Sequence, residues 1–292
     1  MYKSGFVAVI GRPNVGKSSI LNDLIGEKIS IISNRPQTTR NKIQMVYTDE
    51  KMQAIFLDTP GIQMPKNELG EYMLKVSRSA FEEVDLILFV VDTSLETGRL
   101  DSYIIEELKK VSLPIVCVIN KTDLVNEEEK AELIDKYKKM NMFDRIVTSS
   151  ALEGDVGGIL EGIYDLLEEG PMYYPDDMIT DQPIRNIVAE IVREKSLINL
   201  REEIPHGIFV GVDKISTRNE KLTDIIATIF VEQKSHKGMV IGKNGQMLKR
   251  IGSEARKDIE RLLEKKVNLQ LWVKVEKDWR KKKNKVKEFG YE

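Results

Sequence analysis

A glycine-rich loop near the start of the chain has the residue types of a phosphate-binding site. It runs from Gly11 to Ser18 and follows the apolar run Phe6–Ile10. Backbone amides of such a loop, continued by the amino end of a helix, form a concave site for phosphate. Lys17 would place positive charge on the β- and γ-phosphates, and the Ser18 hydroxyl suits Mg²⁺. The strand before the loop and the helix after it favour this interpretation over an ordinary glycine turn. The expected contacts are Gly11, Arg12, Pro13, Asn14, Val15, Gly16, Lys17 and Ser18.

A second motif, Asp58-Thr59-Pro60-Gly61, ends another apolar run. Alone it would be a good β-turn. After a phosphate loop, Asp58 is typical of the acidic residue that holds Mg²⁺ through a water. The Gly61 amide can approach a γ-phosphate because no side chain intervenes. We include Thr59, Pro60 and the following Ile62 in the expected nucleotide site.

The third motif, Asn120-Lys121-Thr122-Asp123, predicts the choice of base. The Asp123 carboxylate can accept hydrogen bonds from N1–H and the exocyclic amine of guanine. Adenine offers no such pair of donors, so a buried, unpaired carboxylate would disfavour ATP. Asn120 and Lys121 would brace the loop and cover the ring. A backbone amide of the weaker tripeptide Ser149-Ser150-Ala151 is placed to reach guanine O6.

A polar stretch between the first two motifs, residues 37–41, contains two threonines. A threonine in such a segment can ligate Mg²⁺ while the γ-phosphate is present and release it after hydrolysis. We favour Thr39 over Thr38; the alternative is an ordinary polar surface loop.

The catalytic glutamine that Ras-like switches place after the glycine of the second motif is replaced here by Ile62. Gln63 stands one position after the place of this glutamine, where its side chain should point elsewhere. We therefore expect intrinsic hydrolysis of GTP to be slow. Asn14 could bind K⁺ beside the phosphates, where other GTPases use an arginine finger. The catalytic group we expect is Asn14, Lys17, Thr39 and Gly61.

The elements that must position these motifs form a mostly parallel, doubly wound α/β sheet over residues 3–170. Several of its expected strands are almost wholly apolar, as parallel strands covered on both faces are. We expect strands at 6–10, 43–48, 53–57, 86–91, 115–119 and 145–148. We expect helices at 17–25, 69–84, 101–111, 127–140 and 156–168. Residues 171–182 contain two prolines and an aspartate pair, which indicates a linker.

Charge divides the chain into two parts. Residues 1–182 carry 20 Lys/Arg and 31 Asp/Glu, a net charge of −11, whereas residues 183–292 carry 25 and 16, a net of +9. The basic part is where nucleic acid would bind. The single cysteine, Cys117, excludes an internal disulfide framework and, with two histidines, makes a zinc site improbable. We see no signal peptide and no apolar run long enough for a membrane span, so we expect a cytoplasmic protein.

The basic part, residues 183–292, has the order α-β-β-α-α-β. Its expected elements are helix 184–200, strands 207–216 and 222–232, a short helix, helix 246–265 and strand 268–275. The loop between the last two helices, Gly242-Lys243-Asn244-Gly245, fits the Gly-x-x-Gly loop with which KH domains grip nucleic acid backbone. Ile241 beside it would contact splayed bases. Alone, the loop could be a glycine turn between core helices; the element order and the charge favour RNA binding.

A lysine-rich tail follows, residues 279–287. RNA phosphate contact is the favoured interpretation. Attraction to an anionic membrane surface is second, and a solvated helix end with no partner is the third.

With both parts in place, the chain resembles the Era family of bacterial GTPases over almost its whole length. The resemblance covers the motifs above together with Gln37-Thr38-Thr39-Arg40, the run Glu202-Glu203-Ile204-Pro205-His206 and the type II KH loop. It implies binding of GTP or GDP with Mg²⁺, and hydrolysis of GTP coupled to binding the 3′ end of 16S ribosomal RNA during assembly of the 30S subunit. It also implies loose membrane association. We expect a monomer.

Two other functions stay open from the sequence. One is a membrane-associated signalling GTPase whose basic domain docks on anionic lipid. The other is a passive RNA-binding module whose nucleotide site is only structural.

Overall fold

A computed structural model describes residues 1–33, 35, 37–201 and 204–292. By internal contacts the chain forms two compact units, the first made of residues 1–30, 39–65 and 73–181. The second is made of residues 31–38, 66–72 and 182–292.

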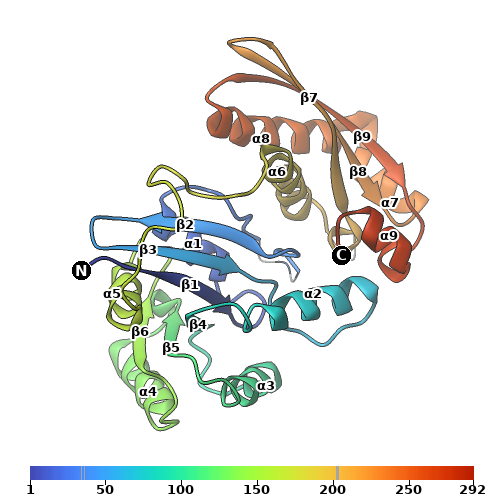
Figure 1. Ribbon diagram of the computed structural model, residues 1–292. Coiled ribbons are helices and arrows are strands. Elements are labelled where there is room, and N and C mark those ends of the chain that lie inside the picture. The colour runs from blue at the N-terminus through green and yellow to red at the C-terminus, as the bar shows by residue number, and fades with distance from the viewer. Residues whose placement is uncertain (34, 36, 202–203) are drawn as a thin grey trace. The chain divides into compact units, whose positions relative to one another are not determined.

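The first unit contains a six-stranded sheet in the order β2-β3-β1-β4-β5-β6 (Figure 1). All neighbouring strands are parallel except β2 and β3, which pair antiparallel from Ile43↔Asp58 to Thr48↔Gln53. This arrangement confirms the predicted mostly parallel sheet. The strands are β1 (Lys3–Ile10), β2 (Ile43–Thr48), β3 (Met52–Asp58), β4 (Leu86–Val91), β5 (Ile115–Asn120) and β6 (Arg145–Ser149).

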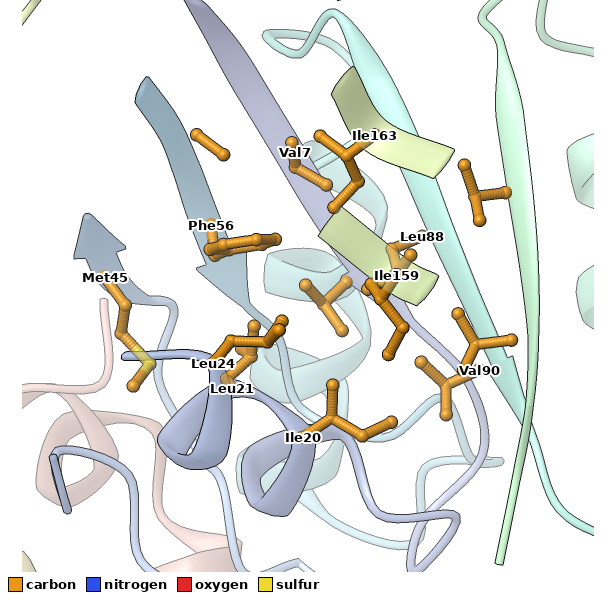
Figure 2. Close-up of a cluster of buried hydrophobic side chains, with 14 of the residues drawn as sticks. Val7, Ile20, Leu21, Leu24, Met45, Phe56, Leu88, Val90, Ile159 and Ile163 are labelled. Atoms are coloured by element: carbon orange, nitrogen blue, oxygen red, sulfur yellow. The ribbon is translucent and has the colours of Figure 1, made fainter. Parts of the chain in front are cut away.

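Helices cover both faces of this sheet, because the strands bury apolar side chains on both sides. Figure 2 shows one face, where residues of α1 and α5 pack on β1, β3 and β4 around Phe56. On the other face, side chains of α3 and α4 pack around Phe89 of β4 and Cys117 of β5. The helices are α1 (Lys17–Ile25), α2 (Glu68–Ser79), α3 (Arg99–Leu108), α4 (Glu127–Lys138) and α5 (Gly157–Leu166), with a 3-10 turn η1 (Thr122–Leu124).

The parallel strands carry the three sequence motifs to one edge of the sheet. The phosphate loop follows β1, Asp58 ends β3, and Asn120 ends β5. Ser149 ends β6 beside Asn120 in the strand register. The carboxyl ends of parallel strands are the usual place for a ligand in such folds.

The expected linker, residues 171–182, is packed against the first unit almost to its end. The backbone amides of Tyr173 and Tyr174 donate to the Gln53 side chain at 2.7 and 3.0 Å. The Thr180 hydroxyl donates to the carbonyl oxygen of Gln44 at 2.6 Å. Hydrogen bonds to β2 and β3 thus hold this segment in place, whereas a free linker would leave these groups to water.

The second unit contains a three-stranded sheet, β7-β8-β9, with β7 and β8 antiparallel and β8 and β9 parallel. One face packs on α6 and α8 through a core that includes Ile191, Ile225, Ile251 and Ile259. The elements are α6 (Ile184–Asn199), η2 (Pro205–Gly207), β7 (Phe209–Asn219), β8 (Leu222–Val231), α7 (Lys234–Ile241), η3 (Lys243–Gly245), α8 (Gln246–Leu263) and β9 (Lys266–Val275). The order α-β-β-α-α-β is the predicted one.

The lysine-rich tail is folded and has a buried face. It forms η4 (Trp279–Lys281) and α9 (Lys283–Glu288), and Trp279 is fully buried. The Trp279 indole donates to the Gly207 carbonyl at 2.9 Å, and Phe289 stacks on Phe209 with ring centroids 4.0 Å apart. The tail is therefore held to the second unit through its apolar residues, while most of its lysines are exposed to solvent.

Within the described ranges, no helix is both long enough and apolar enough to cross a membrane.

Candidate functional sites

The phosphate loop is held in a conformation that glycine and a buried lysine make possible. Gly16 has φ +104°, and a Cβ there would stand 2.1 Å from the Asn120 side-chain nitrogen. Lys17 begins α1, and its ammonium group donates to the carbonyl oxygens of Gly11 and Arg12 at 3.2 and 3.1 Å. The lysine therefore spans the hollow of the loop, where phosphate oxygens would replace the two carbonyls as its partners.

Burial sets the charge behaviour of Lys17 and Asp58. Desolvation lowers the pKa of Lys17 to about 8, although the Asp58 carboxylate opposes this shift. Burial likewise raises the pKa of Asp58, against the effects of Lys17 and of three hydroxyl groups. Both shifts disfavour charge in the ligand-free site, so an incoming phosphate and cation would relieve them.

Hydroxyl groups converge on Asp58, at the end of β3. The Ser18 hydroxyl donates to Asp58 Oδ2 at 2.7 Å and lies 3.0 Å from the Thr39 hydroxyl. Thr39 reaches the same Oδ2 at 3.5 Å, and Ser30 donates to it at 2.9 Å. Asp58 Oδ1 is buried and has no hydrogen-bond partner among the described residues. Hard oxygen atoms gathered at a carboxylate whose other oxygen is unsatisfied fit Mg²⁺.

The two candidate threonines differ in position. Thr39 is buried beside Ser18 and Asp58. The Thr38 hydroxyl instead donates to the Arg35 carbonyl at 2.6 Å. The geometry therefore favours Thr39 as the magnesium ligand.

Other motif residues brace the site rather than face a ligand. The Arg12 side chain forms an ion pair with Asp92 and another, at 3.0 Å, with Asp101. The buried Thr59 hydroxyl donates to the Val9 carbonyl at 2.7 Å, which fixes the turn to β1. Gly61 lies against the phosphate loop, since a Cβ there would be 2.6 Å from the Pro13 nitrogen.

The remaining residues of these two motifs are buried or tied to neighbours. Val15 and Ile62 belong to the core, at 0 and 2 % exposure. The Pro60 carbonyl accepts the Ser77 hydroxyl at 2.8 Å. Of this group, only backbone groups are placed to meet a nucleotide.

Hydrogen bonds join the base motif to the phosphate loop and to the residues at and just after the end of β6. Asn120 donates to the Val15 carbonyl at 2.8 Å, and its side-chain oxygen accepts from the Ser149 hydroxyl and the Ala151 amide. The Thr122 hydroxyl donates to the Ser149 carbonyl at 3.0 Å. Asn120 thus joins the phosphate loop to residues 149–151, which would hold the base.

Two further contacts orient the groups that would meet guanine. The Ser150 hydroxyl donates to Asp123 Oδ1 at 2.7 Å. Lys121 donates to the carbonyl of Asn14 at 2.7 Å, across to the phosphate loop. Sequence reasoning expected only a backbone contact from residues 149–151, and missed the Ser150 hydroxyl as the group that fixes Asp123.

In the second unit, the Gly-x-x-Gly loop joins α7 to α8 as predicted. Gly242 has φ +72°, and a Cβ there would stand 2.7 Å from the Met247 Cβ. Lys243, Asn244 and Gly245 form the single turn η3, and Asn244 also has a positive φ of 52°. This tight turn leaves the Lys243 and Asn244 side chains exposed, where a backbone phosphate could contact them.

A groove of about 450 Å³ begins at this loop and runs between α8 and β9. Its lining combines apolar and basic side chains, which suits bases and phosphates together. The lining residues are Gly245, Leu248, Lys249, Gly252, Ser253, Arg256, Leu269 and Leu271. Ile241, expected to contact bases, packs against the core and is not part of this lining.

The run Glu202-Glu203-Ile204-Pro205-His206 is described only in part. Glu202 and Glu203 lie outside the described residues, and Pro205 begins η2. The turn ends at Gly207, whose carbonyl accepts the Trp279 indole. The turn η2, which begins within this run, therefore anchors the C-terminal segment through Gly207.

Comparisons with known proteins agree with this geometry. A family profile described as 50S ribosome-binding GTPase matches residues 6–121, and a KH domain profile matches residues 203–280. GTPase Era of Clostridioides difficile strain 630 is 53 % identical over 294 residues, covering 100 % of this chain and 99 % of that protein. The chain belongs to the Era family of GTPases. Era of Alkaliphilus metalliredigens strain QYMF is also 53 % identical, over 293 residues, with 100 % and 99 % of the two chains covered.

Two solved Era structures share the whole fold. A crystal structure of Era in complex with MgGDPNP and nucleotides 1506–1542 of 16S ribosomal RNA is 41 % identical, with a TM-score of 0.96, and covers 100 % of this chain and 99 % of that one. A variant of Aquifex aeolicus Era bound to GDP·AlF4⁻ is 41 % identical, with a TM-score of 0.95 and 99 % coverage of both chains. The predicted fold class, a P-loop GTPase domain followed by a KH domain, is confirmed.

Proposed function

We propose that this protein is a GTP-hydrolysing switch that binds the 3′ end of 16S ribosomal RNA and assists assembly of the 30S subunit in the cytoplasm. The observation that carries the proposal is that one chain of the Era family brings together the motifs expected for a guanine nucleotide and a groove beside a KH loop. Residues 3–170 would handle the nucleotide, residues 171–182 would link the domains, and residues 183–292 would bind RNA as part of a monomer.

In the nucleotide site, Asp123 would accept both guanine donors while Ser150 holds its carboxylate in place. Lys17 and the backbone amides of the loop would bind the phosphates. Ser18, Thr39 and Asp58 are the residues that would hold Mg²⁺. When bound, this cation supplies positive charge that offsets the negative charge on the β- and γ-phosphates.

Hydrolysis would rely on Asn14 rather than on a glutamine. Ile62, which follows Gly61, is 2 % exposed and has no polar group to orient water. The Asn14 carbonyl is held by Lys121, while the residue as a whole is exposed at the loop surface. We assign its amide oxygen the role of a K⁺ ligand beside the phosphates. Lys17, Thr39 and the Gly61 amide would complete the group that stabilises the transition state.

In the KH unit, we assign phosphate contact to Gly242, Lys243, Asn244 and Gly245, and base contact to the apolar wall of the groove. Ile241 would support the loop from the core. The exposed face of the tail, which includes Lys281, Lys282 and Lys283, would add phosphate contacts outside the groove.

Binding of an RNA oligonucleotide with the 16S 3′-terminal sequence tests this function. Affinity should exceed that for the same composition in reversed order, and the double variant Lys243→Asp, Asn244→Asp should lose it while GDP binding persists. Lys138→Asp with Asn141→Asp, two exposed positions of the first unit, is the matched control. Unchanged RNA affinity in the Lys243 and Asn244 variant, or tighter binding to anionic vesicles than to RNA, would contradict the proposal.

A further inference from the structure

Ser30 contacts the proposed magnesium carboxylate but belongs to none of the nucleotide motifs. Its hydroxyl donates to Asp58 Oδ2 at 2.9 Å, and the residue is fully buried. The other two hydroxyls on Oδ2 come from Ser18 and Thr39, the residues that would themselves ligate the cation. Of these three hydroxyls, those of Ser18 and Thr39 are also expected to bind the metal, whereas that of Ser30 is not.

The position of Ser30 is fixed by a side chain of the helix that follows the phosphate loop. Asn22 of α1 donates to the Ser30 carbonyl at 2.6 Å. The same side chain accepts from the backbone amides of Ile29 and Ser30 at 3.0 and 2.9 Å. Because α1 also carries Lys17 and Ser18, one helix sets the place of the phosphate ligand, the metal ligand and the hydroxyl on Asp58.

The two oxygens of Asp58 are left in different situations by these contacts. Oδ2 accepts the hydroxyls, whereas Oδ1 is buried without a hydrogen-bond partner in the described part of the chain. A hydrogen bond to an ionised carboxylate is charge-assisted and directional. A fixed donor on Oδ2 therefore also fixes where Oδ1 points.

We propose that Ser30 is a positioning residue for magnesium binding: held by Asn22, it orients Asp58 so that Oδ1 faces the water shell of the cation. The proposal rests on the proposed role of Asp58 in holding Mg²⁺. Thr39 is expected to leave when the γ-phosphate is lost, whereas the contacts that hold Ser30 come from Asn22 of α1 and not from the nucleotide. The effect of Ser30 should accordingly be present with GDP as well as with a GTP analogue.

Release of a fluorescent GDP from the full-length protein, measured across buffered free Mg²⁺ concentrations, tests the proposal. Ser30→Ala removes the donor, and Ser30→Cys fills the site with a slightly larger side chain that is a much weaker donor. Both should raise the Mg²⁺ concentration for half-maximal retention of GDP by about three- to tenfold, the scale of the net contribution of one ordinary hydrogen bond. Retention at saturating Mg²⁺ should stay at the parental level.

Two further variants make each outcome decisive. Ser4→Ala removes a buried serine of the same unit that bonds the Pro171 carbonyl at 2.7 Å, and should keep the parental Mg²⁺ dependence. If Ser30→Cys is parental and only Ser30→Ala is weakened, Ser30 acts by packing and the proposal is wrong. If Asp58→Ala shifts the Mg²⁺ dependence but neither Ser30 variant does, this inference alone is overturned. If Asp58→Ala also has no effect, the magnesium assignment itself is overturned.

Discussion

Replacing Lys17 by Met should change how the stability of the ligand-free protein depends on pH. Lys17 is buried, and desolvation lowers its pKa to about 8 from 10.5. The unfolded chain therefore binds a proton at Lys17 more tightly than the folded chain does. This costs the folded state free energy below pH 8, and the cost is relieved as pH rises from 8 towards 10.5.

The size of this effect follows from the pKa shift. The full shift corresponds to about 3 kcal/mol, at 1.36 kcal/mol for each pKa unit. Between pH 7 and 9.5 the titration is incomplete, and the linkage relation gives about 2 kcal/mol. Relative to Lys17→Met, which cannot titrate there, the parent should gain about that much free energy of unfolding over this interval. The variant should also lose nucleotide affinity.

Denaturant unfolding at several pH values provides the assay. Both tryptophans, Trp272 and Trp279, lie in the second unit. A circular dichroism transition that tryptophan fluorescence does not follow therefore belongs to the first unit. Lys139→Met, at an exposed position of the same unit, is the control and should run parallel to the parent. Parallel curves for the parent and Lys17→Met would show that burial does not lower the pKa of Lys17.

Three further predictions follow from the two units. Asp123→Asn should weaken GTP binding by about 10²-fold or more and favour xanthosine triphosphate, whose edge complements an amide; unaltered preference for GTP over ATP would contradict the assignment. GTP turnover should rise several-fold when K⁺ replaces Na⁺ at constant ionic strength, and Asn14→Ala should lose this difference while still binding nucleotide; equal rates in both salts would exclude a role for K⁺. Trp279→Ala should lower the free energy of unfolding of the second unit by about 3–5 kcal/mol, read from the fluorescence of Trp272; a change below about 1 kcal/mol would mean that the tail is not held through this side chain.

The parts of the fold that the sequence predicted are those that local pattern determines. Apolar runs place β4 and β5 to within a residue, since both faces of a central strand must be apolar. We predicted a helix over residues 69–84, but α2 ends at Ser79. The apolar residues beyond its end, such as Phe81 and Val84, pack on the core without continuing the helix. The periodicity of apolar residues alone does not show whether such residues continue a helix or lie beyond its end.

The contacts that the sequence could not predict join residues far apart in the chain. Ser30 reaches Asp58 across 28 positions, and Arg12 reaches Asp101 across 89. The predictions for the tail rested on its lysines, whereas the fully buried Trp279 determines how the tail folds. A tryptophan is usually buried in large part, and its indole N–H then needs an acceptor, so Trp279 is the residue of the tail that could have indicated this packing.

Crosslinking of the protein to 16S ribosomal RNA, mapped at nucleotide resolution with a GTP analogue and then with GDP, tests the central claim most directly. We expect crosslinks concentrated at the 3′ end, abolished by Lys243→Asp with Asn244→Asp and different in amount between the two nucleotides. Crosslinks spread over the RNA without preference, or the same in number and position with either nucleotide, would contradict a GTP-switched RNA-binding function.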